Sequence, residues 1–328
     1  MSSHDLDVIG IGNALVDVLS HESETFLERH GLAKGTMHLI DEARAGALYD
    51  AMGPAVEISG GSAANTMVGV ASFGGRAHYI GKVRNDQLGE VFSHDLKSVG
   101  VQYTTPMATS GPSTGRCLIV VTADAQRTMN TYLGASTQLG PADVGARLIA
   151  RARILYLEGY LFDPPAAQEA FRAAAGFAHA AGSKVALTLS DPFCVDRHRA
   201  AFVDLVERHV DVLFANEVEI CALYEANEFE AALQQVRRHC EIAALTRSER
   251  GSVVVAGGDV HVIEAHKVNA VVDTTGAGDL YASGFLFGLS RGMDLPMCGR
   301  LGSLAAAEVI SHVGARPVTP LAEMARVS

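Results

Sequence analysis

The sequence has no tryptophan, and aromatic residues make up only 6% of its 328 positions. No apolar run reaches the roughly 18 residues that cross a lipid bilayer. The first residues include acidic side chains where a secretory signal would carry basic ones. Lysine and arginine form no cluster, and the formal net charge is −11. These absences argue against a membrane, secreted or nucleic-acid-binding protein, and we expect a cytoplasmic one.

Several catalytic and metal-binding patterns are also missing. The 13 histidines include no HExxH, and the five cysteines are scattered without a CxxC pair. Neither a G-x-S-x-G elbow nor a G-x-x-x-x-G-K-[ST] loop occurs. Zinc chemistry, disulfide bonds, serine hydrolysis and P-loop chemistry therefore have no support in the sequence.

The chain contains an alternation of apolar strands and helices. Apolar residues account for 48% of the chain and charged residues for 19%, which is typical of a globular protein. Helices are expected at 62–73 with Ser62 as the N-cap, at 87–99 and at 165–181. The alternation predicts an α/β fold, a doubly wound sandwich, as a single domain over residues 1–328. The short apolar runs that indicate parallel strands buried on both faces are 7–11, 77–83, 154–157, 184–189, 211–215 and 242–246.

The region between residues 100 and 140 breaks this rhythm, because it suggests strands and no helix. Residues 116–122 and 127–133 look like a hairpin, and residues 36–40 like another short strand. We interpret these as a small β-sheet lid built from insertions near 12–40 and 101–138. Extra edge strands of the main sheet are the alternative. A further hairpin at 252–256 and 260–263 and two helices, at 277–291 and 296–312, are expected near the end.

The strongest motif is DTTGAGD at residues 273–279. It follows an apolar run at 268–272 that we interpret as a strand, and it opens a helix that is apolar on nearly every side. The first turn of a helix presents unpaired N–H groups with about half a positive charge. Gly276 and Gly278 leave room for an anion beside these groups. Asp279 is then the predicted base that accepts a proton from an attacking hydroxyl, with a plain helix cap as the alternative.

A second motif, GGSAAN, begins with Gly60 and Gly61, which let a ligand approach the backbone closely. Asn65 offers a donor and an acceptor, as sugar hydroxyls require. The spacing is not that of a dinucleotide fingerprint, so a dinucleotide-dependent oxidoreductase is disfavoured. Asp17, at the end of GIGNALVD, is a carboxylate that can accept hydrogen bonds from two vicinal ribose hydroxyls. A tight turn and a surface loop are the structural alternatives for these two segments.

Two weaker signals follow later apolar strands. Asn216 and Glu219 would lie on one face of a helix and could hold the hydration shell of Mg²⁺, although a helix cap explains them as well. Thr246, Ser248 and Gly251 belong to a polar turn that could line a nucleotide site or be an ordinary turn.

The order of these motifs resembles that of the ribokinase-like (PfkB) carbohydrate kinases over essentially the whole chain. The resemblance implies a Rossmann-like α/β sandwich with a β lid, Mg²⁺-ATP as the donor, and phosphorylation of a sugar or nucleoside hydroxyl. The residues that carry it are Asn13, Asp17, Gly60, Gly61, Asn65, Gly81, Asp86, Gly89, Leu96, Gly100, Val101, Asn216, Glu219 and residues 273–279.

The same resemblance assigns roles by position. Asp279 is the expected base, with an anion hole of Gly276, Ala277 and Gly278. Asn216 and Glu219 are the expected magnesium element. The remaining expected contacts are substrate binding by Asn13, Asp17, Gly60, Gly61 and Asn65, and ATP binding by Asn216, Thr246, Ser248, Gly251, Thr275 and Gly278.

Within the family, the segments around Asp17 and Asp279 are most similar to those of adenosine kinases. This likeness implies that Arg127, on the lid hairpin, contacts the transferred phosphate, and that Leu15, Met129 and Tyr160 form the base pocket. The expected reaction is phosphorylation of a nucleoside 5′-hydroxyl, adenosine to AMP. A ribose or fructose kinase and a non-enzymatic nucleoside sensor are the alternatives. A K⁺ ion near residue 273 and a homodimer through the lid stay open.

Overall fold

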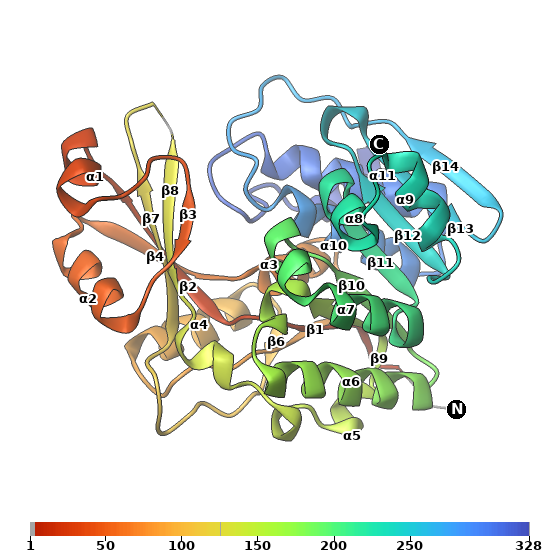
Figure 1. Ribbon diagram of the computed structural model, residues 1–328, viewed down its shortest axis with the longest axis horizontal. Helices are drawn as coiled ribbons and strands as arrows, with labels where there is room; N and C mark the ends of the chain where they lie inside the picture. The colour runs from red at the N-terminus through yellow and green to blue at the C-terminus, as the bar shows by residue number, and fades with distance from the viewer. Residues whose placement is uncertain (1–3, 125, 328) are drawn as a thin grey trace.

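The computed structural model describes residues 4–124 and 126–327, which build two β-sheets and the helices around them (Figure 1). The larger sheet has nine strands, and in spatial order these are β14 (Asp259–Ile263), β13 (Ser252–Ala256), β12 (Ile242–Thr246), β11 (Val212–Asn216), β10 (Lys184–Thr188), β9 (Ala152–Glu158), β1 (Leu6–Ile11), β5 (Ala77–Ile80) and β6 (Gln102–Tyr103). Neighbouring strands from β6 to β12 are parallel, and β13 and β14 add an antiparallel hairpin. The predicted doubly wound α/β fold is confirmed.

Helices cover both faces of the main sheet, so every residue of its strand β1 is buried. On one face, side chains of α3, α10 and α11 pack together with Val8, and on the other, side chains of α6, α7, α8 and α9 pack together with Leu155. The twelve α-helices of the described residues are α1 (Glu24–His30), α2 (Glu42–Ala51), α3 (Ser62–Ser72), α4 (Gln87–Ser98), α5 (Ala146–Ile149), α6 (Pro165–Ala180), α7 (Pro192–His209), α8 (Glu217–Tyr224), α9 (Phe229–Val236), α10 (Ala277–Ser290), α11 (Leu295–Val309) and α12 (Leu321–Val327). Four short 3₁₀ turns are η1 (Gly134–Gln138), η2 (Pro141–Asp143), η3 (Gly159–Phe162) and η4 (Ser248–Arg250). None of the helices within the described ranges is both long and apolar enough to span a membrane.

The second sheet, called the lid here, stands beside the carboxyl ends of the main strands (Figure 1). Its five strands in spatial order are β3 (Met37–Leu39), β8 (Arg127–Tyr132), β7 (Gly115–Val121), β2 (Leu15–His21) and β4 (Ala55–Gly60). Side chains alternate between the two faces of a strand. Val16 and Leu118 therefore pack with Phe26 of α1 and Leu48 of α2 on the outer face, while Asp17 lies on the inner face. The lid includes β4, which lies outside the two expected segments, and it is a separate sheet rather than an edge of the main one.

Two expected strands differ from the structure. Strand β5 ends at Ile80 instead of residue 83, because the carbonyl of Gly81 accepts a hydrogen bond from the Tyr103 hydroxyl instead of pairing with a strand. The run at 268–272 forms no strand: Val271 and Val272 are 59% and 47% exposed, and the N–H of Val272 donates to the Ile310 carbonyl at the end of α11. The prediction of a strand before the 273–279 motif was wrong.

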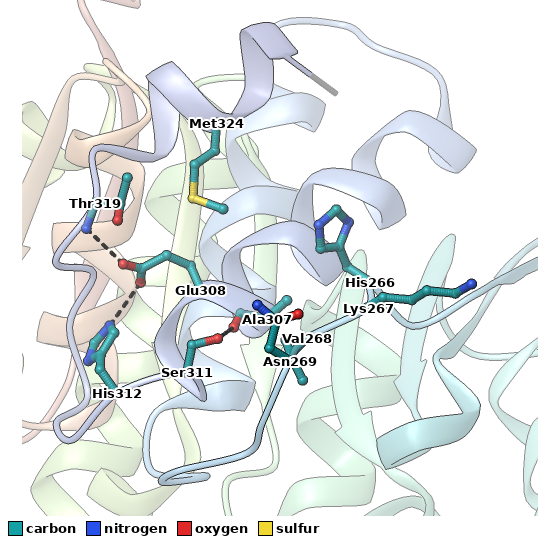
Figure 2. A pocket seen from close by; sticks show the side chains of 10 residues that line it. All are labelled: His266, Lys267, Val268, Asn269, Ala307, Glu308, Ser311, His312, Thr319 and Met324. Atoms are coloured by element: carbon teal, nitrogen blue, oxygen red, sulfur yellow. Dashed lines mark hydrogen bonds and ion pairs between the residues drawn. The ribbon is translucent and has the colours of Figure 1, made fainter.

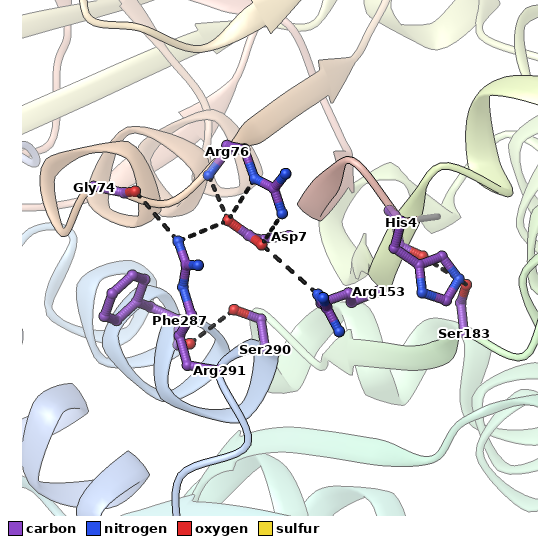
Figure 3. Close-up of polar contacts among 10 residues, drawn as sticks. His4, Asp7, Gly74, Arg76, Arg153, Ser183, Phe287, Ser290 and Arg291 are labelled. Carbon is purple, nitrogen blue, oxygen red and sulfur yellow. Dashed lines mark hydrogen bonds and ion pairs between the residues drawn. The ribbon is translucent and has the colours of Figure 1, made fainter. Parts of the chain in front are cut away.

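The opposite edge of the main sheet is held by a buried carboxylate on β1. Asp7 has no exposed surface and accepts hydrogen bonds from the Arg76 backbone and guanidinium and from Arg291 Nη2 at 3.1 Å (Figure 3). Arg153 stands 3.9 Å from the same carboxylate. These ion pairs join β1 to α10 and to the start of β5, and they leave the carboxyl edge of the sheet free to form a site.

Candidate active site

Several of the predicted functional residues lie where the strand order of the main sheet reverses. The chain runs from β1 outward to β5 and β6, and then returns to β9 and proceeds to the other side. Ligands of open α/β sheets bind at such a switch point, outside the carboxyl ends of the strands. Asp17 follows β1 across a short connection, and Glu158 is the last residue of β9.

The first turn of α10 lies in this candidate site. Its N-cap, Gly276, has φ 78° and provides no side chain to cap the helix. A β-carbon on Gly276 would lie 2.8 Å from the Ala315 carbonyl oxygen, so only glycine allows this close approach. A β-carbon on Gly278, by contrast, would meet no atom within 4 Å. The open space beside uncapped helix N–H groups is the geometry that an anion site needs.

Asp279 lies in the same turn and faces a second helix N-terminus, that of α3. Its Oδ1 accepts a hydrogen bond from Ser62 Oγ at 2.6 Å, and its Oδ2 accepts one from Asn65 Nδ2 at 3.2 Å. Burial raises the pKa of Asp279 to about 6, although both hydrogen bonds favour the carboxylate. Such a group is ionised at neutral pH and still basic enough to accept a proton. The predicted N-cap role of Ser62 was wrong, because Gly61 is the N-cap and the serine hydroxyl turns to Asp279.

Asp17 sits on the inner face of the lid strand β2, against the paired glycines. A β-carbon on Gly60 would lie 2.4 Å from the Asp17 carboxyl, and one on Gly61 would lie 2.2 Å from the Asn13 carbonyl. Burial raises the pKa of Asp17 to about 6, and the positive charges of Arg316 and Arg127 act against this rise. The glycines therefore let the lid strand and helix α3 approach closely around one carboxylate.

Arg127 connects the lid to the 273–279 motif. Its Nη2 pairs with Asp273 Oδ2 at 3.1 Å, and its Nη1 donates to Thr275 Oγ1 at 3.4 Å. Asp273 also accepts hydrogen bonds from the backbone N–H groups of Thr275 and Gly314. The guanidinium is therefore directed from β8 to the loop that opens α10.

Asn13 and Glu158 are buried and hydrogen-bonded to each other beside the candidate site. Glu158 accepts hydrogen bonds from the backbone and side-chain N–H groups of Asn13, both at 3.0 Å, and from the Ala63 N–H at 2.7 Å. The Asn13 amide oxygen accepts from Ser136 Oγ. Burial raises the pKa of Glu158 to about 7. The amide nitrogen and the amide oxygen of Asn13 both have protein partners. The predicted direct contact between Asn13 and a substrate stays a prediction.

The expected nucleotide residues lie at neighbouring strand ends. Asn216 ends β11 and pairs in register with Thr246, the last residue of β12. Ser248 begins the η4 turn, and Gly251 caps its end. Asn216 and Glu219 form a reciprocal cap of α8, in which each side chain accepts from the other's backbone N–H, and Glu219 Oε1 also accepts from Asn216 Nδ2 at 2.7 Å. Burial raises the pKa of Glu219 to about 7.

The three residues expected in the base pocket come from three elements, β2, β8 and η3. Leu15 is buried beside Gly60 and Gly115, Met129 packs with Ile119 on the lid, and Tyr160 is 38% exposed in η3. A cavity of about 230 Å³ opens elsewhere on the lid, and none of the three lines it. Its lining residues are Leu39, Ile40, Pro112, Thr131, Tyr132, Leu133, Gly134 and Thr137.

Three polar features of the candidate site were not predicted from the sequence. They are the hydrogen bond from Ser62 to Asp279, the carboxylate of Glu158 and the guanidinium of Arg316. Glu158 had a detectable signal, since a glutamate ends an apolar strand. Arg316 had none, because it lies in an irregular segment after α11 and reaches Asn65, 251 positions earlier.

The fold is of the ribokinase-like type, and comparison with known proteins gives the family. Residues 42–322 match the pfkB family carbohydrate kinase profile. The chain is 52% identical to an adenosine kinase from Sinorhizobium meliloti, with a TM-score of 0.91 over 98% of this chain and 99% of that one. A probable sugar kinase from Rhizobium etli is 49% identical with a TM-score of 0.91 over 98% of both chains. An adenosine kinase of Saccharomyces cerevisiae is 26% identical over 94% of this chain and 95% of that protein. This chain belongs to the pfkB family of carbohydrate kinases.

Proposed function

We propose that this protein transfers the γ-phosphoryl group of ATP to the 5′-hydroxyl of a nucleoside, with adenosine as the foremost acceptor and AMP as the product. The observation that supports it most is the position of Asp279, in the uncapped first turn of α10 and hydrogen-bonded to Asn65. Near Asp279 lies Asp17, a carboxylate suited to accept hydrogen bonds from two vicinal ribose hydroxyls. The likeness to the Sinorhizobium meliloti adenosine kinase also supports a nucleoside acceptor.

The mechanism starts from an acceptor bound between Asp17 and Asn65, with its reacting hydroxyl directed at Asp279. Asp279 accepts the hydroxyl proton as the hydroxyl oxygen attacks the γ-phosphorus, and ADP leaves in line. The N–H groups of α10 and the guanidinium of Arg127 stabilise the charge on the phosphoryl oxygens. The lid keeps water away from the phosphoryl group, which would otherwise be hydrolysed.

Kinases of this family use ATP with Mg²⁺. Within the described ranges, no three His, Cys, Asp or Glu side chains converge as a metal-ligand set. Both Glu219 oxygens accept hydrogen bonds from Asn216, so this pair fits an outer position, where it would orient water molecules around the ion. The Mg²⁺ would neutralise charge on the phosphates. K⁺ near Asp273 and a homodimer through the lid stay predictions.

A sugar kinase acting on ribose or fructose is the second candidate. In the proposed mechanism Asp17, Asn65 and Asp279 would contact only hydroxyl groups of the acceptor, which a free sugar also presents. The probable sugar kinase from Rhizobium etli supports this alternative. A base pocket would separate the two, and the cavity lined by Leu39 and Tyr132 is an apolar candidate for it.

The test offers adenosine, inosine, guanosine, ribose and fructose separately with Mg²⁺-ATP and measures ADP release, with D279N as the inactive control. We expect the highest kcat/KM with adenosine. Faster turnover of ribose or fructose would replace the nucleoside proposal with the sugar alternative. Nucleoside binding without ADP release would indicate a sensor.

A further inference from the structure

Arg316 is a largely buried arginine that touches three elements around the candidate site. Its side chain is 15% exposed and lies in the irregular segment between α11 and α12. Its Nη1 donates to Asp95 on α4 at 2.7 Å, its Nη2 to Ser59 Oγ on β4 at 2.6 Å, and its Nε to Asn65 Oδ1 on α3 at 3.3 Å. A guanidinium is costly to bury unless its donors are satisfied. Here each nitrogen has a partner, so the side chain has one defined position.

The contact between Arg316 and Asn65 determines which way the asparagine amide faces. A guanidinium has only donors, so it faces the amide oxygen. The amide NH₂ group is then turned to Asp279, whose carboxylate only accepts, at 3.2 Å. The reversed amide would place its oxygen against the carboxylate and its NH₂ group against the guanidinium. Arg316 therefore fixes the amide in the orientation that holds the expected base.

Arg316 also lies near Asp17: its Nη2 donates to Ser59, the residue before Gly60, and a β-carbon on Gly60 would lie 2.4 Å from the Asp17 carboxyl. Three charged side chains act on this carboxylate: Arg316 and Arg127 on β8 favour its ionised form, and Asp279 on α10 disfavours it. Cys117, opposite Asp17 on β7, is a neutral thiol, since burial raises its pKa to about 12. Of the two cations, Arg127 already pairs directly with Asp273.

The backbone on both sides of Arg316 is anchored. The N–H of Gly314 donates to Asp273 Oδ2 at 2.9 Å. Beyond Arg316, the N–H of Thr319 donates to Glu308 Oε1 at 2.7 Å, beside a cavity of about 300 Å³ (Figure 2). The segment that carries Arg316 is therefore tied to the 273–279 motif at one end and to α11 at the other.

We propose that Arg316 is a positioning residue of the acceptor site: it orients the Asn65 amide toward Asp279 and keeps Asp17 as the carboxylate that binds the acceptor hydroxyls. This inference rests on the proposed function in that Asp17 binds the acceptor. It predicts two separable effects of losing Arg316, one on turnover through Asn65 and one on the pH dependence of acceptor binding through Asp17.

The test compares R316Q, R316K and the unaltered protein by equilibrium dialysis with adenosine across a pH series, without ATP. In the unaltered protein, binding should strengthen as the pH rises through about 6, the pKa of Asp17. In R316Q the midpoint should move up by about one pH unit, so that binding weakens about twofold at pH 7 and about fivefold at pH 6, and recovers at higher pH. R316K keeps the charge and should restore the midpoint, while its kcat stays about tenfold low because lysine does not reproduce the fork that orients Asn65.

The control variant is R153Q. Arg153 lies beside Asp7, away from the candidate site (Figure 3). Its replacement should change neither the pH midpoint of adenosine binding nor kcat. Thermal unfolding of each variant reports stability separately. A lowered unfolding temperature in R316Q with an unmoved pH midpoint would reduce Arg316 to a structural role and overturn the proposal. If R316Q does not fold, R316K is the deciding variant. A pH midpoint of adenosine binding that differs from that of the unaltered protein, or a kcat equal to that of the unaltered protein, would refute the proposal.

A second readout separates this inference from the proposed function. The Asp17 carboxyl carbon can be followed by ¹³C NMR during a pH titration, with D17N to assign its signal. Its midpoint should rise in R316Q even if the protein phosphorylates none of the acceptors tested. An unmoved Asp17 titration sinks the Arg316 inference alone, whereas absent ADP release with a moved titration sinks the proposed function alone.

Discussion

Ser62 and Asp279 are joined by a hydrogen bond of 2.6 Å, although 217 positions separate them in the chain. The bond brings the first turns of α3 and α10 together, so two helix N-termini meet at one carboxylate. Helix N-termini favour negative charge, and the serine hydroxyl adds a donor to it. Burial works in the opposite direction and raises the pKa of Asp279 to about 6. The carboxylate is thus held in place and ionised at neutral pH.

Removing the serine hydroxyl should weaken the carboxylate form of Asp279. In S62A the pKa of Asp279 should rise above its value of about 6, since one of its two hydrogen bonds is lost. A base must be deprotonated to act, so kcat should fall at neutral pH and recover as the pH rises. The pH profile of kcat measures this shift. S98A, at the exposed end of α4, is the matched control and should keep the original profile; an identical profile in S62A would contradict the role of the hydroxyl.

Asp279 itself is tested by an isosteric change. D279N should lower kcat by about 10²–10⁴-fold, which is the usual contribution of a general base. The amide keeps the size of the side chain, so ATP and adenosine should still bind, as measured by calorimetry. D204N, a surface aspartate on α7, controls for the loss of a carboxylate. Retained turnover in D279N would remove Asp279 from the role of base.

Asp17 should matter for binding and hardly at all for the donor. In D17A the acceptor KM should rise at least about tenfold, because two hydroxyls lose a charged acceptor. The KM for ATP should change little, since Asp17 lies on the lid strand and away from Asn216 and Thr246. Initial-rate kinetics with each substrate varied in turn decides this. D50A, on helix α2 of the lid, is the control, and an unchanged acceptor KM in D17A would place the ribose elsewhere.

The main sheet could be predicted from the sequence because its strands are buried on both faces. The run 242–246 is apolar up to its last residue, Thr246, and β12 has these same bounds. Strand β4 escaped because its first four residues, 55–58, lie at the edge of the lid and only one of them is even partly buried, so they show no buried face. The run at 268–272 was predicted as a strand because it is mostly apolar. In the described part of the chain it has no neighbouring strand to pair with, so its valines stay irregular and exposed.

The candidate site also has a part that the sequence predicts and a part that it does not. Local motifs identified Asp279, Asn65 and Asp17, since glycines and helix starts are visible within a few residues. What supports these side chains depends on contacts between distant segments. Glu158 reaches Asn13 across 145 positions, and Arg316 reaches Ser59 across 257. No spacing rule predicts such pairs, because they follow from how the layers pack.

The two glycines of the proposed anion site, Gly276 and Gly278, give the sharpest prediction, because replacing Gly276 should affect folding and replacing Gly278 should affect ATP binding. In G276A the new methyl group meets the Ala315 backbone at 2.8 Å, at a residue whose φ is +78°. Strain of this kind costs about 1–3 kcal/mol, so the unfolding temperature should fall. In G278A the methyl group meets no protein atom within 4 Å, and alanine favours a helix more than glycine does, so stability should hold or rise. That methyl group would instead occupy the space beside the helix N–H groups, and the KM for ATP should rise at least about tenfold as the phosphate is displaced. Thermal unfolding and ATP kinetics on both variants separate the effects. An unchanged ATP KM in a stable G278A would show that the phosphate does not bind at this helix.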